Sequence, residues 1–172
     1  GRNDLSELTM EGHQQALKTG QALLELPMDY VYSSPLKRAA ATTNFLLEAK
    51  ENELLPSFDK NLLEVDLAPW SGLTTNEVKA KFPKEYQIWK RDPQDLVLFR
   101  EGGSKYKPIK ELMDQAKNFI RSLLERHPIN EDNTVLVVAH NAILRCLVLV
   151  LLGEPTKGFR RLRLDNASLS VF

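Results

Sequence analysis

Apolar residues recur at helical spacing in several stretches of the chain. The clearest stretch runs from Pro108 to Arg126, where the apolar positions follow the i, i+3, i+4, i+7 rule of an amphipathic helix: Ile109, Leu112, Met113, Ala116, Phe119, Ile120, Leu123 and Leu124. Similar spacing predicts a helix over residues 9–26, with Thr9 as a good N-cap, and further helices over 36–47 and 143–152. A charged helical region is expected from residue 75 past residue 89.

Short apolar runs between these helices predict strands. Residues 134–139 (TVLVVA) form a continuous apolar run, which is typical of a strand buried on both faces of a parallel sheet. Residues 30–32, 62–65 and 167–172 predict three more strands, the last of them a candidate edge strand. This alternation of helices and strands favours a three-layer α/β/α fold with a mostly parallel central sheet. With 172 residues and no long linker, a single domain over 1–172 is expected.

Charge and cysteine content exclude some classes of function. Lys plus Arg and Asp plus Glu number 23 each, so the net charge is zero, which argues against a dedicated nucleic-acid or acidic-membrane surface. No apolar run has the length of a membrane span. Cys146 is the only cysteine, so no internal disulfide can form, and a reducing compartment is expected: the cytoplasm, or the plastid stroma if the source is a plant. Its place on an apolar helical face predicts an inert core residue.

Three polar residues follow predicted strands, where open α/β sheets bind their ligands. His140 follows the buried run, Arg38 comes shortly after the strand at 30–32, and Glu64 lies near the end of the strand at 62–65. Arginine offers a bidentate fork for phosphate, histidine can stabilise charge or move protons, and a carboxylate can act as general acid or base. These residue types together indicate chemistry on an anionic substrate, without separating phosphoryl transfer from carboxylate chemistry.

Each candidate also has a structural interpretation. His140 could be a core or helix-capping histidine, Arg38 one half of a surface ion pair, and Glu64 a solvated carboxylate. Four other residues are expected to lie outside the chemistry, two histidines at the surface and two tryptophans in packing: His13, His127, Trp70 and Trp89.

Four segments, in order and in register, resemble motifs of the histidine phosphatase superfamily, which has a phosphoglycerate-mutase-like fold. They are residues 1–12 (GRNDLSELTMEG), 33–42 (SSPLKRAAAT), 63–72 (LEVDLAPWSG) and 137–145 (VVAHNAILR). The resemblance implies that Arg38 holds the phosphoryl group, that Glu64 is the proton donor and then the base, and that His140 stabilises the transition state. Asn141, where many members have glycine, is expected to contact substrate. No metal or other cofactor is implied.

The resemblance also implies a phosphohistidine intermediate on the histidine of an Arg-His-Gly motif at the end of a first strand. That motif does not occur in the sequence, so this strand is expected to be missing from the chain, and the chain alone is expected to be inactive. Three explanations are open: an upstream segment outside the sequence, a truncation, or a degenerate pseudoenzyme. The first two are favoured because Arg38, Glu64 and His140 are all present.

The expected function is hydrolysis of a small phosphorylated metabolite, a sugar phosphate or a phosphoglycerate-like compound. The alternatives are a phosphoglycerate-type mutase and a non-catalytic phosphate-binding remnant. Several residues, among them Trp89 and Pro93, look similar to the plant and cyanobacterial branch, which includes phosphatases of 2-carboxyarabinitol 1-phosphate. In that interpretation residues 74–107 form a cap over the pocket. The expected partner is the phosphorylated substrate, with no nucleic acid and no membrane, and a homodimer is left open.

Overall fold

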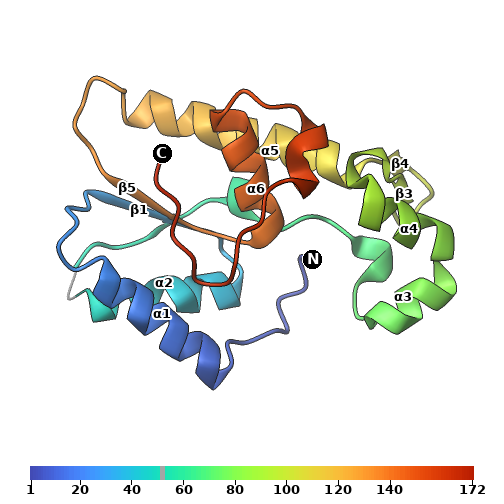
Figure 1. Cartoon of the computed structure of the whole chain (residues 1–172), viewed down its shortest axis with the longest axis horizontal. Coiled ribbons are helices and arrows are strands. Elements are labelled where there is room, and N and C mark those ends of the chain that lie inside the picture. Colours follow the sequence, from blue (N-terminus) through green and yellow to red (C-terminus); the bar gives the residue numbers. More distant parts are fainter. Residues whose placement is uncertain (51–52) are drawn as a thin grey trace.

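The computed structural model describes residues 1–50 and 53–172, and it has three layers with a small sheet in the middle (Figure 1). Helices α1 (Met10–Ala22) and α2 (Lys37–Ala49) cover one face of the sheet. Helices α5 (Pro108–Arg126) and α6 (Asn141–Leu151) cover the other. The predicted α/β/α architecture is therefore confirmed.

The central sheet has the strand order β2 (Ser57–Phe58), β1 (Tyr30–Ser33), β5 (Val135–Val138), and both pairings are parallel. In the β1–β5 pair, Tyr30 lies opposite Val135 and Ser33 opposite Val138. The two strands therefore end level with each other. The residues that follow them, Ser34 and His140 among them, meet at the same edge of the sheet.

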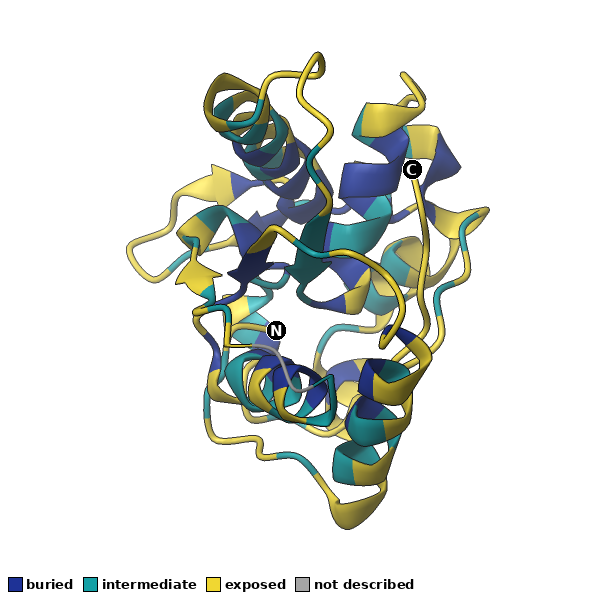
Figure 2. Cartoon of the chain, turned by 90° about the vertical axis from the view of Figure 1, so that its left-hand side faces the viewer, coloured by how far each residue is buried: buried dark blue, intermediate teal, exposed yellow. Residues whose placement is uncertain are grey.

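Strand β5 lies where the apolar run predicted it, but the expected burial on both faces is wrong. All four of its residues are half-buried, as the intermediate colouring in Figure 2 shows. The reason is the position of β5 at the end of the strand order: among the described residues it pairs with β1 alone.

Two predicted strands are wrong. Around residues 62–65 the chain forms a 3-10 turn, Lys60–Leu62, followed by irregular structure. The Asp59 carboxylate accepts the Asn61 N–H there, and the Gln115 side chain binds the carbonyl oxygens of Asn61 and Leu63, so local side-chain bonds replace a ladder. Residues 167–172 are exposed and have no regular structure, since they pair with no strand of the described chain.

The helices agree more closely with prediction. Helix α5 has the expected bounds, and its buried face packs against α6 in the main hydrophobic cluster through residues that include Ile109, Phe119 and Ile143. Thr9 caps α1 as expected by accepting the Gly12 N–H. The helix ends at Ala22, earlier than predicted.

Helices α1 and α2 touch at Gly20. A Cβ atom there would lie 2.4 Å from the carbonyl oxygen of Leu46 and 2.7 Å from the Cβ of Ala49. The absence of a side chain therefore permits this close approach of the two helices.

A second hydrophobic cluster lies at one end of the molecule. It is built by α3 (Thr75–Lys81), α4 (Pro83–Arg91) and the antiparallel pair β3 (Leu98–Phe99) and β4 (Lys105–Tyr106), which Figure 1 shows together beyond the end of α5. Its buried members are Trp70, Val78, Leu96, Leu98 and Tyr106. Leu67 and Trp89 pack against both clusters and so connect them.

None of the described helices is both long enough and apolar enough to cross a bilayer.

Candidate active site

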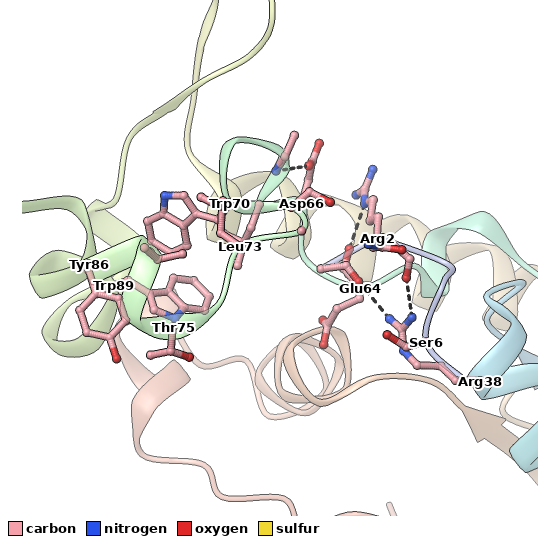
Figure 3. Close-up of a pocket in the computed structure, with 17 residues that line it drawn as sticks. Arg2, Ser6, Arg38, Glu64, Asp66, Trp70, Leu73, Thr75, Tyr86 and Trp89 are labelled. Carbon is pink, nitrogen blue, oxygen red and sulfur yellow. Dashed lines mark hydrogen bonds between the residues drawn. The ribbon is translucent and has the colours of Figure 1, made fainter. Parts of the chain in front are cut away.

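A cleft of about 720 Å³ lies between the end of the central sheet and the helices α3 and α4. Four segments line it: the N-terminal residues, the start of α2, the loop from Glu64 to Leu73, and one face of α3 and α4 (Figure 3). Arg38 and Glu64, two of the four predicted site residues, are on its wall.

Arg38 lies in the first turn of α2, directly after the end of β1. Its two terminal nitrogens donate to main-chain oxygens, Nη1 to Asn3 at 2.9 Å and Nη2 to Gly1 at 3.0 Å. These carbonyls orient the guanidinium toward the cleft, as the dashed lines in Figure 3 show, without neutralising it. Arg38 therefore contributes a positive charge and a planar set of N–H donors to this end of the cleft.

Glu64 connects the cleft to the start of α6. One carboxylate oxygen accepts the N–H of Val65 at 2.8 Å, and the other lies 3.4 Å from the N–H of Ala142, in the first turn of α6. The main-chain oxygen of Glu64 accepts Nε of Arg2 at 2.9 Å. The carboxylate is thus held between the loop after Glu64 and the first turn of α6.

His140 is not one of the residues that line the cleft. It is 7% exposed, and its Nε2 is 2.7 Å from the hydroxyl oxygen of Ser34, which is fully buried. Burial, and then the nearby charge of Arg38, lower the pKa of the His140 imidazole to about 4. The side chain is consequently neutral at pH 7 and offers one N–H donor and one acceptor.

Asn141, the fourth predicted site residue, is not one of the residues that line the cleft. Its amide nitrogen donates to the main-chain oxygen of Leu164 at 2.8 Å, and the residue is exposed. Asn141 therefore ties the start of α6 to the C-terminal segment.

The other end of the cleft is aromatic. Trp70, Tyr86 and Trp89 line it, and the two indole rings meet edge to face at 6.1 Å with an interplanar angle of 84°. Both tryptophans pack as predicted, and both also line the cleft, a position that the sequence pattern did not indicate. Spacing could have shown this for α4, since Tyr86 and Trp89 are three residues apart and share one helix face.

Arg2 and Asp66 also line the cleft and were missed. Arg2 reaches across to Gln115 as well as to Glu64, with Nη2 2.9 Å from the Gln115 side-chain oxygen. Its place in a loop before the first helix gave no periodic signal. The charged side chains that line the cleft are thus two guanidinium groups and two carboxylates.

Cys146 is fully buried, and burial raises the pKa of its thiol to about 12, so the prediction of an inert core residue is confirmed. The two histidines predicted at the surface are half-buried there. His13 packs on Phe45 with ring centroids 4.5 Å apart, and His127 lies 2.7 Å from the hydroxyl of Tyr32. No group of three or more metal-ligating side chains occurs among the described residues.

Comparison with known proteins agrees with this arrangement. The chain is 34% identical over 171 residues to a probable 2-carboxy-D-arabinitol-1-phosphatase of Arabidopsis thaliana, a match that covers 99% of this chain and 33% of that protein. The chain therefore spans about a third of the length of that relative. It is also 34% identical over 168 residues to phosphoserine phosphatase 1 of Hydrogenobacter thermophilus, covering 98% of this chain and 74% of that protein.

A solved structure described as mycobacterial glucosyl-3-phosphoglycerate phosphatase superposes on the fold with a TM-score of 0.78 at 25% identity, covering 95% of this chain and 75% of that one. Residues 1–172 match the histidine phosphatase superfamily (branch 1) from end to end. The chain belongs to branch 1 of the histidine phosphatase superfamily.

Proposed function

We propose that the protein containing this chain is a phosphomonoester hydrolase that acts on small phosphorylated metabolites through a phosphohistidine intermediate. The observation that carries the proposal is the presence of the Arg38 guanidinium and the Glu64 carboxylate at the same end of one cleft. A guanidinium binds phosphate, and a carboxyl group can protonate a leaving oxygen. The Arabidopsis and Hydrogenobacter relatives are named as phosphatases, which supports the same class of reaction.

In this proposal Arg38 binds the phosphoryl group by exchanging its two main-chain carbonyl partners for phosphoryl oxygens. A histidine nitrogen attacks phosphorus, the ester P–O bond breaks, and Glu64 gives its proton to the leaving oxygen. Glu64 then takes a proton from water, whose oxygen attacks phosphorus. The N–P bond breaks, inorganic phosphate leaves, and the histidine and the protonated Glu64 are restored.

The nucleophilic histidine is the one that the resemblance assigns to an Arg-His-Gly motif, which these 172 residues do not contain. The edge of β5 that faces away from β1 has no paired strand within the described ranges, 1–50 and 53–172. A further parallel strand on that edge would end beside His140. We therefore place the nucleophile of the full-length protein there.

His140 and Asn141 have supporting parts in the proposal. His140 is neutral at pH 7, so it would donate an N–H to a phosphoryl oxygen, and a bound phosphate dianion would favour its protonated form. The amide nitrogen of Asn141 is used by Leu164, which leaves the amide oxygen to accept a hydrogen bond from a substrate hydroxyl at the rim.

Residues 74–107 are proposed as a cap, because α3 and α4 supply the wall of the cleft opposite the sheet. The proposed reaction uses no metal, since Arg38 carries the charge that the phosphoryl group requires. A buried, unpaired Cys146 suits a reducing compartment, so we propose the cytoplasm, or the plastid stroma in a plant.

The proposal is tested by following phosphate release from p-nitrophenyl phosphate with the full-length protein. Arg38→Met is expected to lower kcat/KM by about 10²–10³-fold, as for other groups that stabilise transition-state charge. Arg121→Met, at an exposed position of α5, is the matched control and should leave kcat/KM unchanged. In a second assay the protein is incubated with 3-phosphoglycerate, and formation of its isomer without free phosphate would indicate a mutase. Phosphate binding without turnover of either substrate would indicate a non-catalytic protein.

A further inference from the structure

We infer that the cleft selects phosphate esters whose alcohol part is uncharged and has an apolar ring, which packs against Trp89 and Tyr86. The inference rests on the proposed phosphatase function, because it concerns the part of the substrate that leaves. It narrows the expected range of substrates: phosphoglycerate-like compounds are disfavoured, since they carry a carboxylate on the alcohol part.

Charged side chains are distributed unevenly along the cleft. Arg2 and Arg38 lie at the end formed by the N-terminal residues and α2, next to Glu64 (Figure 3). Of the described residues that line the cleft between positions 67 and 89, none is charged. A phosphoryl group therefore finds its counter-charges at one end only, and its alcohol part must extend toward the uncharged end.

Asp66 lies between the charged end and the aromatic end of the cleft (Figure 3). Its carboxylate is half-buried, and one oxygen accepts the N–H of Ala68 at 3.0 Å, which fixes its position. A carboxylate or second phosphate on the alcohol part would lie beside this negative charge, and none of the described residues that line the cleft beyond Asp66 is a cation. Like-charge proximity of this kind disfavours anionic ligands and so adds selectivity.

The guanidinium groups of Arg160 and Arg100 are both engaged by other residues. The guanidinium of Arg160 lies 5.2 Å from the centre of the Trp89 indole ring and donates to the main-chain oxygen of Trp89, at the end of α4. Arg100 forms an ion pair with Glu111 at 2.6 Å. Neither arginine lines the cleft, so neither supplies a positive charge for an anionic group on the alcohol part.

The aromatic wall of the cleft is partly uncovered. No residue of α4 is fully buried, and Tyr86 and Trp89 keep part of their rings uncovered on the side that lines the cleft. Trp70 and Trp89 meet at an interplanar angle of 84°, so the two indole rings form an angled apolar wall. Such a wall packs well against another ring or an apolar chain, with the hydroxyls of Thr75 and Tyr86 available for neutral polar groups.

Three alkyl phosphates test the inference on the full-length protein: methyl phosphate, benzyl phosphate and 3-phosphoglycerate. We expect kcat/KM for benzyl phosphate to exceed that for methyl phosphate by about tenfold or more, because the ring is removed from water against Trp89. We expect 3-phosphoglycerate to be no better than methyl phosphate. A preference for 3-phosphoglycerate, or equal rates for benzyl and methyl phosphate, would overturn the inference while leaving the phosphatase function intact.

A matched pair of variants locates the effect. Trp89→Leu keeps an apolar residue in the cluster but removes the ring face, so the ratio of benzyl to methyl phosphate turnover should fall to about one. Ile88→Ala changes the neighbouring residue of α4, which is 39% exposed and does not line the cleft, and should keep the ratio. Equal changes in both variants would count against a specific role for Trp89.

A binding measurement separates this inference from the phosphatase proposal. Trp70 and Trp89 are the only tryptophans of the chain, and both line the aromatic end, so their fluorescence reports on that end alone. Titration of the chain with benzyl alcohol should give a saturable fluorescence change, and titration with glycerate should give none. A response to glycerate alone, or no response to benzyl alcohol, would refute the inference, whether or not any ester is hydrolysed.

Discussion

The imidazole Nε2 of His140 lies 2.7 Å from the hydroxyl oxygen of Ser34, and both side chains are closed off from solvent. This pairing joins the ends of two parallel strands, since Ser34 follows β1 and His140 follows β5. The hydrogen bond fixes the ring at the sheet edge, while burial holds it in the neutral form.

The low pKa of His140 makes stability depend on pH. The unfolded chain takes up a proton at the ordinary histidine pKa of 6.5, whereas the folded chain does so only near pH 4. Stability from this group is therefore complete above pH 6.5 and is lost as the pH falls toward 4, by about 3 kcal/mol in all. Urea unfolding of the wild type and of His140→Gln across this range should show a steeper loss in the wild type. Parallel curves would contradict the prediction.

Glu64→Gln tests the proposed proton donor in the full-length protein. The amide keeps an oxygen to accept the N–H of Val65 but cannot give a proton to the leaving group. We expect kcat/KM, which reports on formation of the phosphohistidine, to fall by about 10²–10⁴-fold with an alkyl phosphate, and by much less with p-nitrophenyl phosphate, whose leaving oxygen needs no proton. Glu125→Gln, at an exposed site on α5, is the control. Equal losses with both substrates would remove Glu64 from the role of acid.

The close contact of α1 with α2 predicts that replacement of glycine by alanine in α1 changes stability in opposite directions at positions 20 and 12. Gly20→Ala places a methyl group 2.4 Å from the Leu46 carbonyl oxygen, so we expect a loss of about 1–3 kcal/mol in the free energy of unfolding. Gly12→Ala, in the same helix, meets the flexible end of Leu8 at 3.2 Å and should be neutral or stabilising by up to about 1 kcal/mol. Chemical denaturation of both variants checks the pair, and a stable Gly20→Ala would disprove the close approach.

Cys146 is expected to resist thiol reagents in the folded protein. Its sulfur is fully buried, and a pKa of about 12 leaves almost no thiolate at neutral pH. A chromogenic disulfide reagent should therefore label one thiol in denaturant and none without it. Rapid labelling of the native protein would place Cys146 outside the core.

Much of the fold followed from periodicity. The helix at Pro108–Arg126 was predicted with its observed bounds because its apolar stripe is long and regular. Residues 62–65 were misassigned because hydrogen bonds from Asp59 and Gln115, which no local pattern shows, decide their conformation. Residues 167–172 have the composition of a strand, but pairing depends on a neighbour and not on composition.

The candidate site was predicted in part. Strand ends and motifs identified Arg38 and Glu64, which the structure brings to one cleft. They did not show that His140 would pair with Ser34 or that Asn141 would bind Leu164, because both depend on the tertiary path of the chain. The aromatic end was missed since rings that pack and rings that bind look alike in a sequence.

Leu67 and Trp89 belong to the packing of both hydrophobic clusters, and this has a consequence for cooperativity. A hinge between two bodies needs a boundary with few shared contacts. Here the same two side chains complete the interior on either side, so the helices α3 and α4 cannot separate from the sheet without opening both interiors. The molecule should therefore melt as one cooperative unit, and the aromatic wall should be already formed before any ligand arrives.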